Sequence, residues 1–252
     1  MLLLQHGFGE YARRYVERHG ALIPRLLRLG VSVHAFDLRG HGHSPGRRAL
    51  TDVDRCVTDH LAARRRLAGQ PLPVLLMGHS LGGIVTATSV VRDASHVSGV
   101  ILSSPALLVS ANPLTRLFGR VVSTVAPALP VKRLPPSGIS RIPEQVEAFV
   151  ADPLIYHGGM PARLAASILF TSRDNWARYA TWQAATLVLH GTADTFTEVE
   201  GSRRFVDVIA SPDRTLHVVQ GGYHELLNDL GAEETMSVVL RWVERRLPAG
   251  GG

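Results

Sequence analysis

A serine between two glycines is the residue in this chain most suited to nucleophilic chemistry. Gly78, Ser80 and Gly82 form a G-x-S-x-G pattern that follows the apolar run Val74–Leu76 and precedes the helix-compatible run Ile84–Val91. A strand, a sharp turn and a helix in this order hold a serine at the turn, where the unpaired N–H groups of the helix point at it. The flanking residues must be small because neighbouring backbone comes close. The pattern predicts a nucleophile, although a Gly-rich loop that opens an ordinary helix could produce the same five residues.

A serine hydroxyl reacts at neutral pH only when a base takes its proton and an acid orients that base. Among the twelve histidines, His224 follows a predicted strand and lies in a Gly-rich loop before the last predicted helix. Asp194 follows the preceding predicted strand, which places it better than Asp174 or Asp213. The order Ser80, Asp194, His224 along the chain is that of the α/β-hydrolase triad. We therefore predict that these three residues act together.

The loop after the first predicted strand could complete such a site. Leu2–Leu4 run into the H-G-x-G-like stretch His6–Gly9. A loop of this kind can present a backbone N–H to a developing oxyanion, and the alternative is a simple strand-to-helix turn. A second His-rich turn contains His41 and His43 but offers no third ligand at helical spacing. We therefore expect no metal site in the chain.

The elements that must hold these residues alternate along most of the chain. We expect strands at Leu2–Leu4, Val31–Phe36, Val74–Leu76, Val100–Leu102, Thr186–Leu189 and Arg214–Val219. We expect helices at Ala21–Leu29, after an N-cap at Thr51, at Ile84–Val91, at Val199–Ile209 and at Ala232–Leu247, before a frayed tail at Pro248–Gly252. Strands that alternate with helices predict a mostly parallel, doubly wound sheet flanked by helices.

The alternation stops between about residues 105 and 185, where prolines are frequent and no clear strand is expected. We predict helices near Leu114–Val125, Pro143–Val150 and Arg163–Phe170. An insertion of this length between two strands is typical of a cap over the carboxyl ends of the strands, where ligands bind in such sheets. We therefore predict one domain over residues 1–252, with a helical cap inserted at about 105–185.

Composition excludes several classes of protein. The chain has 252 residues, is 45% hydrophobic and carries a net charge of +6 that rests almost wholly on arginine. These arginines are scattered without an aromatic-rich RNA-binding motif, so we expect no nucleic-acid partner. Cys56 is the only cysteine, which excludes an intrachain disulfide. No apolar run reaches the roughly 18–20 residues of a membrane span, and no signal peptide is visible at the start. We expect a cytoplasmic or peripherally membrane-associated protein.

Six stretches carry a specific resemblance that runs through almost the whole chain. They are His6-Gly7-Phe8-Gly9-Glu10 with Arg13-Arg14-Tyr15, Asp37-Leu38-Arg39-Gly40-His41-Gly42-His43-Ser44, Gly78-His79-Ser80-Leu81-Gly82-Gly83, Asp152-Pro153-Leu154, Leu189-His190-Gly191-Thr192-Ala193-Asp194 and Tyr223-His224-Glu225. On these residues the chain resembles the monoacylglycerol lipase and lysophospholipase group of the α/β-hydrolase family, particularly its bacterial members. The resemblance implies that Ser80 is the nucleophile, His224 the base and Asp194 the acid that orients it.

The same resemblance implies further roles. The oxyanion donors would be the backbone N–H groups of Phe8 and Leu81. Glu10 and Arg14 match positions that help to hold the polar glycerol end of the substrate in the family. One departure concerns the sheet, because family members carry two strands before the one at Leu2–Leu4. We expect either a truncated reading frame, which we favour, or a short sheet with an exposed edge and exposed apolar surface.

The resulting functional prediction is two-step hydrolysis of monoacylglycerols to fatty acid and glycerol through an acyl-enzyme, with no metal or organic cofactor. Two alternatives stay open. The same triad could serve a lysophospholipase or a broader carboxylesterase or thioesterase, or the chain could be a non-catalytic relative. The apolar side of the predicted helix Leu114–Val125 could pack on the core, line an acyl tunnel or touch lipid interfaces transiently. The sequence does not predict an oligomeric state.

Overall fold

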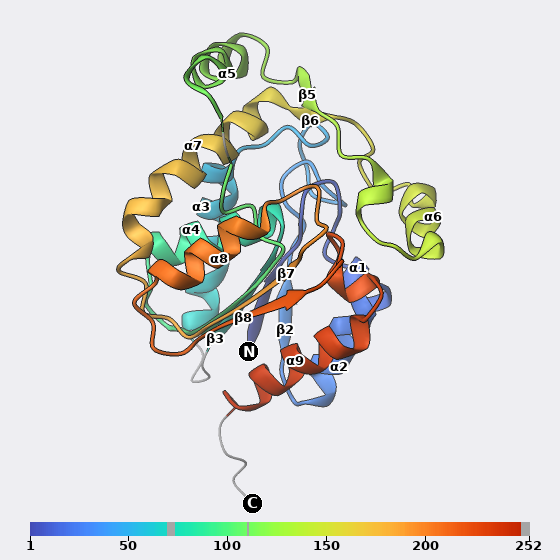
Figure 1. The fold of residues 1–252 in the computed structure, drawn as a ribbon, viewed down its shortest axis with the longest axis vertical. Coiled ribbons are helices and arrows are strands. Elements are labelled where there is room, and N and C mark those ends of the chain that lie inside the picture. Colours follow the sequence, from blue (N-terminus) through green and yellow to red (C-terminus); the bar gives the residue numbers. More distant parts are fainter. Residues whose placement is uncertain (70–73, 110, 248–252) are drawn as a thin grey trace, which may run out of the picture.

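A computed structural model describes residues 1–69, 74–109 and 111–247 of the chain (Figure 1). Within these ranges six strands form one sheet in the order β2-β1-β3-β4-β7-β8, and every neighbouring pair is parallel. The strands are β1 (Leu2–Gln5), β2 (Val33–Ala35), β3 (Val74–His79), β4 (Val97–Ser103), β7 (Thr186–Gly191) and β8 (Arg214–Val219). The predicted parallel sheet is therefore confirmed, because each predicted strand overlaps an observed one. The predicted frayed tail lies outside the described residues.

Helices cover both faces of the sheet. Figure 1 shows α3 (Val53–Ala68), α4 (Leu81–Arg92) and α8 (Val199–Val208) on one face, and α1 (Arg14–Glu17), α2 (Leu22–Arg28) and α9 (Ala232–Glu244) on the other. Successive strand residues point to opposite faces, so Leu2 and Leu4 pack with the core under α2 and α9 while Leu3 packs with the core under α4. Burial on both faces explains why the central strands β1, β3, β4 and β7 are largely apolar, whereas the edge strands β2 and β8 are more exposed and more polar.

The strand register brings the predicted functional residues to one edge of the sheet. Ser103, at the end of β4, lies opposite both His79 at the end of β3 and Leu189 in β7. Since all strands run in the same direction, the loops that follow β1, β3, β7 and β8 leave from the same edge. These loops carry the predicted oxyanion donors, nucleophile, acid and base.

An insertion separates β4 from β7. It contains α5 (Pro113–Val125), β5 (Pro130–Lys132), the 3₁₀ turn η2 (Pro136–Gly138), α6 (Pro143–Ala151), β6 (Met160–Pro161) and α7 (Ala162–Tyr179). All three predicted helices are present, and α7 runs nine residues beyond its predicted end. The expectation of no strand is wrong: β5 and β6 form a short antiparallel pair in which Pro130 lies opposite Pro161. Two further 3₁₀ turns, η1 (His19–Ala21) and η3 (Leu226–Asn228), lie in the core domain.

Strand β2 lies at the edge of the sheet, and no strand among the described residues pairs with its outer side. Beside it runs a groove lined by apolar side chains that include Leu3, Phe36, Ala63 and Leu67. This exposed edge agrees with the expectation for a sheet without the two strands that precede Leu2–Leu4 in the family that the chain resembles. Within the described ranges, no helix combines the length and apolarity needed to cross a bilayer.

Candidate active site

Ser80 occupies a strained turn between β3 and α4. Its backbone lies at φ 54° and ψ −114°, a region that costs energy for any residue with a Cβ atom and that clusters at functional sites. A Cβ atom on Gly78 would lie 2.3 Å from the carbonyl oxygen of Gly82, and one on Gly82 would lie 2.2 Å from that of Gln5. Both glycines are therefore required by close backbone approach, as the G-x-S-x-G pattern predicted.

Asp194 and His224 form a direct pair at the same edge. Asp194 follows β7, His224 follows β8, and Nδ1 of His224 lies 2.7 Å from Oδ2 of Asp194. An ionised carboxylate only accepts, so Nδ1 carries the proton and Nε2 is left free to act as a base. Ser104 Oγ donates to the His224 carbonyl oxygen at 2.8 Å and ties this loop to the end of β4. Ser80 and His224 line one pocket.

The surroundings of Asp194 keep its carboxylate charged. Oδ1 accepts from the N–H groups of Phe196 and Thr197, at 2.8 and 3.1 Å, and Oδ2 accepts from Thr197 Oγ1 at 2.8 Å. Burial alone would raise the pKa of Asp194, but His224 and His190 outweigh it and hold that pKa well below its usual range. Burial alone would lower the pKa of His224, but Asp194 outweighs it and raises that pKa. The pair can thus stabilise an imidazolium.

The predicted oxyanion donors are available. Among the described residues, the N–H groups of Phe8 and Leu81 donate no hydrogen bond. Leu81 is the first residue of α4, where an N–H has no partner within the helix. Both residues line a pocket together with Ser80. The arrangement can place two donors around a carbonyl oxygen that Ser80 attacks.

A polar pocket and an apolar pocket share Ser80, Phe8, Leu134 and Phe196. The polar pocket is also lined by Glu10, His79, Tyr156, His157, His224 and Glu225, together with the apolar Pro136, Ile139 and Phe149. The apolar pocket is also lined by Leu81, Ala106, Leu108, Met160, Ala165 and Ile168, together with Lys132, Thr197 and Glu198. An ester bound at Ser80 therefore has room for a hydrocarbon chain on one side and a hydroxylated group on the other.

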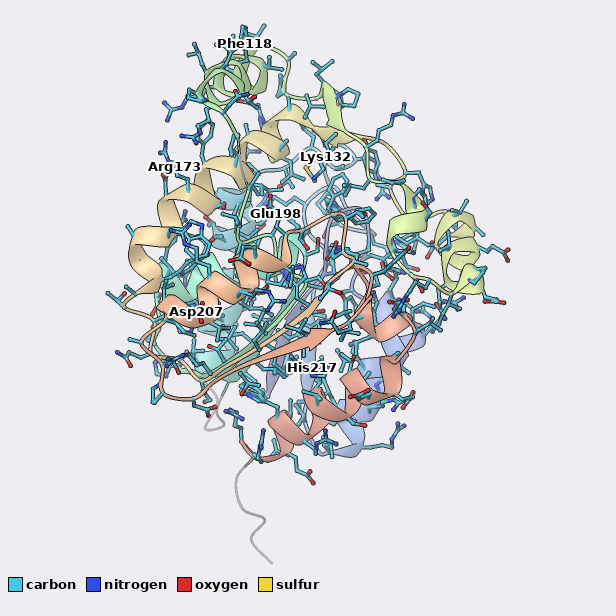
Figure 2. The ribbon with its side chains drawn as sticks, in the orientation of Figure 1. Phe118, Lys132, Arg173, Glu198, Asp207 and His217 are labelled. Carbon is cyan, nitrogen blue, oxygen red and sulfur yellow. The ribbon has the colours of Figure 1, made fainter. Side chains whose placement is uncertain are left out.

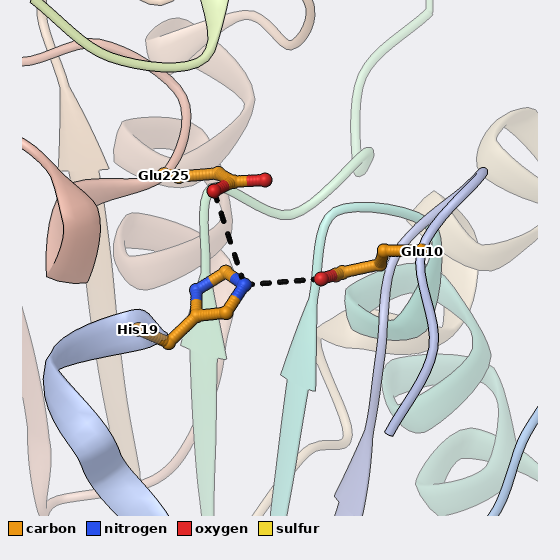
Figure 3. Close-up of side chains that lie close together, drawn as sticks. All are labelled: Glu10, His19 and Glu225. Carbon is orange, nitrogen blue, oxygen red and sulfur yellow. Dashed lines mark hydrogen bonds and ion pairs between the residues drawn. The ribbon is translucent and has the colours of Figure 1, made fainter. Parts of the chain in front are cut away.

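Glu10 and Arg14 belong to a buried charged network. Arg14 donates from Nη1 to Oε2 of Glu10 at 2.8 Å, and from Nη1 and Nη2 to the two carboxylate oxygens of Glu225 at 2.9 and 3.1 Å. His19 Nε2 lies 3.0 Å from the same Glu10 oxygen (Figure 3). Glu10 lines the polar pocket. That Glu10 and Arg14 hold glycerol stays a prediction.

The same network contains donors of the kind that bind metals. Ligand atoms of Glu10, His19 and Glu225 lie within 4.8 Å of one another (Figure 3). The guanidinium of Arg14 already binds both carboxylates. Burial would raise the pKa of Glu225, but Arg14 and then His19 outweigh it and lower that pKa to about 2. The cluster therefore already contains its cation.

Sequence reasoning gave no role to three residues that lie in this site. His190 lies beside Asp194, Glu225 binds Arg14, and His79 places its ring 4.8 Å from the ring of His224. Each lies next to, or four residues from, a predicted catalytic residue. Proximity in sequence was the available signal, but it does not reveal which neighbours point into the site.

Comparison with known proteins now places the chain. The family model described as "Serine aminopeptidase, S33" matches residues 1–231. The chain belongs to this hydrolase family. It is 34% identical to a monoacylglycerol lipase of Mycolicibacterium smegmatis, over 98% of the chain and 89% of that protein. It is 30% identical to a monoglyceride lipase of Homo sapiens, over 100% of the chain and 84% of that protein.

Solved structures agree with this family assignment. A monoacylglycerol lipase of Paleococcus ferrophilus superimposes with a TM-score of 0.88 at 31% identity, over 97% of this chain and 94% of that one. A monoglyceride lipase of Saccharomyces cerevisiae, solved with a substrate analogue, has the same fold, with a TM-score of 0.84 at 21% identity over 98% and 87% of the two chains. The predicted α/β-hydrolase fold and the resemblance to the monoacylglycerol lipase group are confirmed.

Proposed function

We propose that this hydrolase cleaves monoacylglycerols to fatty acid and glycerol. The observation that carries the proposal is the position of Ser80, at a strained turn where a polar and an apolar pocket meet, beside the hydrogen-bonded pair Asp194–His224. A monoacylglycerol has one hydrocarbon chain and one small hydroxylated end, which match the two pockets. The relatives named above carry this activity in their names.

The reaction follows from the assigned roles. His224 takes the proton of Ser80 Oγ as that oxygen attacks the ester carbonyl, and the N–H groups of Phe8 and Leu81 stabilise the resulting oxyanion. The tetrahedral intermediate collapses, the C–O bond to glycerol breaks, and the glycerol oxygen takes the proton from His224. Water, deprotonated by the same histidine, then attacks the acyl-serine. The bond from the acyl carbon to Ser80 Oγ breaks, His224 returns the proton to Ser80 Oγ, and the fatty acid is released. Asp194 stabilises the imidazolium in both steps.

The insertion between β4 and β7 acts as a cap that delivers the substrate from a lipid surface. Helix α5 has no buried residue, and five of its large apolar side chains are more than half exposed, at 53 to 79% for Leu114, Leu117, Phe118, Val121 and Val125. Figure 2 shows Phe118 on α5 at the far end of the molecule from the sheet. The sequence contains no Asp or Glu between Asp93 and Glu144, whereas α5 carries the exposed Arg116 and Arg120. A cationic amphipathic helix of this kind favours an anionic lipid surface.

The polar pocket favours glycerol over the phosphorylated end of a lysophospholipid. Two carboxylates, Glu10 and Glu225, line it and share the single guanidinium of Arg14. Their summed charge is negative, so a phosphodiester would meet like charge in a buried site. A lysophospholipase role on the same triad is therefore the second candidate, and a short-chain carboxylesterase or thioesterase would leave the apolar pocket largely empty.

One experiment tests the nucleophile and the substrate class together. The purified protein is treated with a fluorophosphonate probe, and its hydrolysis of a monoacylglycerol, the matching lysophosphatidylcholine and the matching p-nitrophenyl ester is measured. We expect labelling that is lost in Ser80→Ala and a preference for the monoacylglycerol over the lysophospholipid. A folded protein that is not labelled would be a non-catalytic relative. Equal or faster turnover of the lysophospholipid would contradict the assigned substrate.

A further inference from the structure

The buried guanidinium of Arg14 connects the two loops that must act on the same carbonyl group. It binds Glu10 in the loop after β1 and Glu225 in the loop after β8. We propose that Arg14 is a positioning residue that sets the oxyanion donor Phe8 relative to the base His224. The proposal rests on the ester hydrolysis proposed above and deepens it.

The first half of this connection reaches the oxyanion loop. Oε1 of Glu10 accepts the backbone N–H of Gly7 at 2.7 Å and the hydroxyl of Tyr15 at 3.0 Å. Gly7 directly precedes Phe8, so a carboxylate that holds the Gly7 N–H anchors the peptide unit next to the one that carries the Phe8 donor. Oε2 of Glu10 binds Arg14 at 2.8 Å. A shift of Arg14 would therefore be passed to the oxyanion loop through one buried, hydrogen-bonded side chain.

The second half reaches the base. Glu225 directly follows His224, and its two carboxylate oxygens accept two separate hydrogen bonds from Arg14, at 2.9 and 3.1 Å. Asn228 Nδ2 donates to Glu225 Oε2 at 2.6 Å, and the Glu225 backbone N–H donates to the Ile139 carbonyl oxygen at 2.8 Å. Two parallel bonds to a planar guanidinium define orientation as well as distance. The backbone of the base loop is thus held from both sides.

The network is almost fully buried, although Glu10 and Glu225 line the polar pocket. The side chains of Arg14, Glu10 and Glu225 are 4%, 3% and 4% exposed. The ring of Phe149, from α6, lies 5.1 Å from the Arg14 guanidinium carbon and covers it from the cap side. A buried ion pair is weak support for stability but can specify an arrangement. Oxyanion donors must lie within about 2.7–3.1 Å of the reacting oxygen. An ion pair that fixes the position of the Phe8 donor relative to His224 therefore affects the rate of the chemical step.

The contacts of Glu10 favour this role over a direct contact with glycerol. A carboxylate offers about four acceptor positions. The hydrogen-bond donors of Gly7, Tyr15, Arg14 and His19 occupy four positions on Glu10. Arg14 itself lines neither pocket at Ser80 among the residues that the structure describes. Both side chains therefore act on the loops of the enzyme. A residue that positions these loops affects the hydrolysis of every ester, whereas a residue that contacts glycerol affects only esters of glycerol.

The test compares Arg14→Lys, Arg14→Met and Glu225→Gln with the wild type on two esters of the same fatty acid, a monoacylglycerol and a p-nitrophenyl ester without glycerol. Misplacement by about 1 Å can cost 10²-fold in rate. We expect Arg14→Met to lower kcat by about 10²-fold, by the same factor on both esters, and to leave KM almost unchanged. Arg14→Lys should recover part of kcat because a lysine supplies the charge without the planar fork.

Arg25→Met is the matched control. Arg25 also binds a glutamate with two bonds, to Glu233 at 2.7 and 2.6 Å, but on the surface, so its loss should leave kcat unchanged. If Arg14→Met does not fold, Arg14→Lys and Glu225→Gln must still lower kcat equally on both esters. A loss confined to the glycerol ester, or a rise in KM alone, would overturn the proposal in favour of a glycerol contact. A wild-type protein that hydrolyses the p-nitrophenyl ester but not the monoacylglycerol would refute the proposed function. The kcat values of the variants on the p-nitrophenyl ester would then still test the role of Arg14.

Discussion

Nε2 of His190 lies 3.4 Å from Oδ2 of Asp194, the same oxygen that binds His224 at 2.7 Å. The other ring nitrogen of His190 lies 2.7 Å from Ser202 Oγ. If that hydroxyl donates to Nδ1, the proton of His190 is on Nε2 and faces the Asp194 carboxylate and the Thr197 carbonyl oxygen, 3.3 Å away. Asp194, the predicted acid, is thus flanked by two imidazoles.

His190→Leu should therefore lower kcat while leaving the fold intact. A hydrogen bond to a charged group contributes about 1.5–3 kcal/mol, which is about 10- to 100-fold in rate when it is lost in the transition state. His190→Gln keeps a donor near the same place and should lose less. The measurement is kcat on a soluble ester, with thermal unfolding as the control for folding. Equal kcat in the Leu variant and the wild type would show that His190 does not orient Asp194.

The pH dependence of kcat/KM should have its acidic limb above pH 6.5. Asp194 outweighs burial and raises the pKa of His224, so the imidazole loses its proton, and becomes a base, only at a pH above its usual range. Activity should fall as the pH drops through that raised value. In Asp194→Asn the limb should move to lower pH, while kcat falls by about 10⁴-fold. A wild-type limb at or below pH 6.5 would contradict the raised pKa.

The placement of the three predicted triad residues at one edge of the sheet was predictable because each of them follows a strand. The central strands β1, β3, β4 and β7 are largely apolar runs whose ends are visible in the sequence, and β8 ends in the apolar pair Val218-Val219. Parallel strands bring these ends to one edge. Ser80, Asp194 and His224 could therefore be placed near one another without knowledge of side-chain packing. The helices were predictable for a similar reason, although α3 begins after Asp52, whose side chain caps it, rather than after Thr51.

The charged cluster behind the triad could not be predicted in the same way. Arg14 and Glu225 are 211 residues apart, and charged side chains are ordinarily exposed. Only the tertiary packing of the loops after β1 and β8 shows that both are buried. The pair β5–β6 was missed because proline is rarely found in strands, but a short two-stranded ribbon tolerates Pro130 and Pro161. Family resemblance located Glu10 and Arg14 but not their contacts.

Gly82→Ala should prevent folding or abolish activity. Its new Cβ atom would lie 2.2 Å from the Gln5 carbonyl oxygen, and backbone cannot move aside as a flexible side chain can. The matched control is Gly119→Ala on α5, where a Cβ atom would meet nothing within 4 Å. That change should raise stability by up to about 1 kcal/mol, because alanine favours helix over glycine. The free energy of unfolding in urea checks both. A well-folded, active Gly82→Ala variant would show that the elbow is looser than described.

The stability of the fold should decrease as the pH falls below 6.5. Burial lowers the pKa of His60 to about 3, and its two ring nitrogens have no partner among the described residues. The unfolded state therefore binds a proton between pH 6.5 and 3 that the folded state does not, which favours unfolding as the pH drops. Between pH 8.0 and 5.5 this one residue should cost about 1.4 kcal/mol.

His60→Leu tests that contribution directly. The variant should lose about 1.4 kcal/mol less than the wild type between pH 8.0 and 5.5, in urea unfolding measured at both values. The burial that lowers the pKa of His41 and of His79, to about 3 in each case, should leave a residual pH dependence in the variant. An identical loss of stability in the two proteins would show that His60 can be protonated in the folded state.

The exposed apolar side of α5 should bind lipid surfaces. The double variant with Leu117→Ser and Phe118→Ser removes two side chains that are 61% and 58% exposed. Burying an apolar side chain of this size contributes about 1.5–3 kcal/mol, so partition into vesicles should fall by at least about 10-fold. Vesicles with anionic lipid should bind the wild type more tightly than zwitterionic ones, because Arg116 and Arg120 flank this face.

Two controls separate lipid binding from catalysis. Hydrolysis of a soluble short-chain ester should not change in the double variant, since neither Leu117 nor Phe118 lines the pockets at Ser80. Leu27→Ser, at a residue on α2 that is 55% exposed, should leave vesicle binding unchanged. Unaltered vesicle binding by the double variant would rule out α5 as the contact.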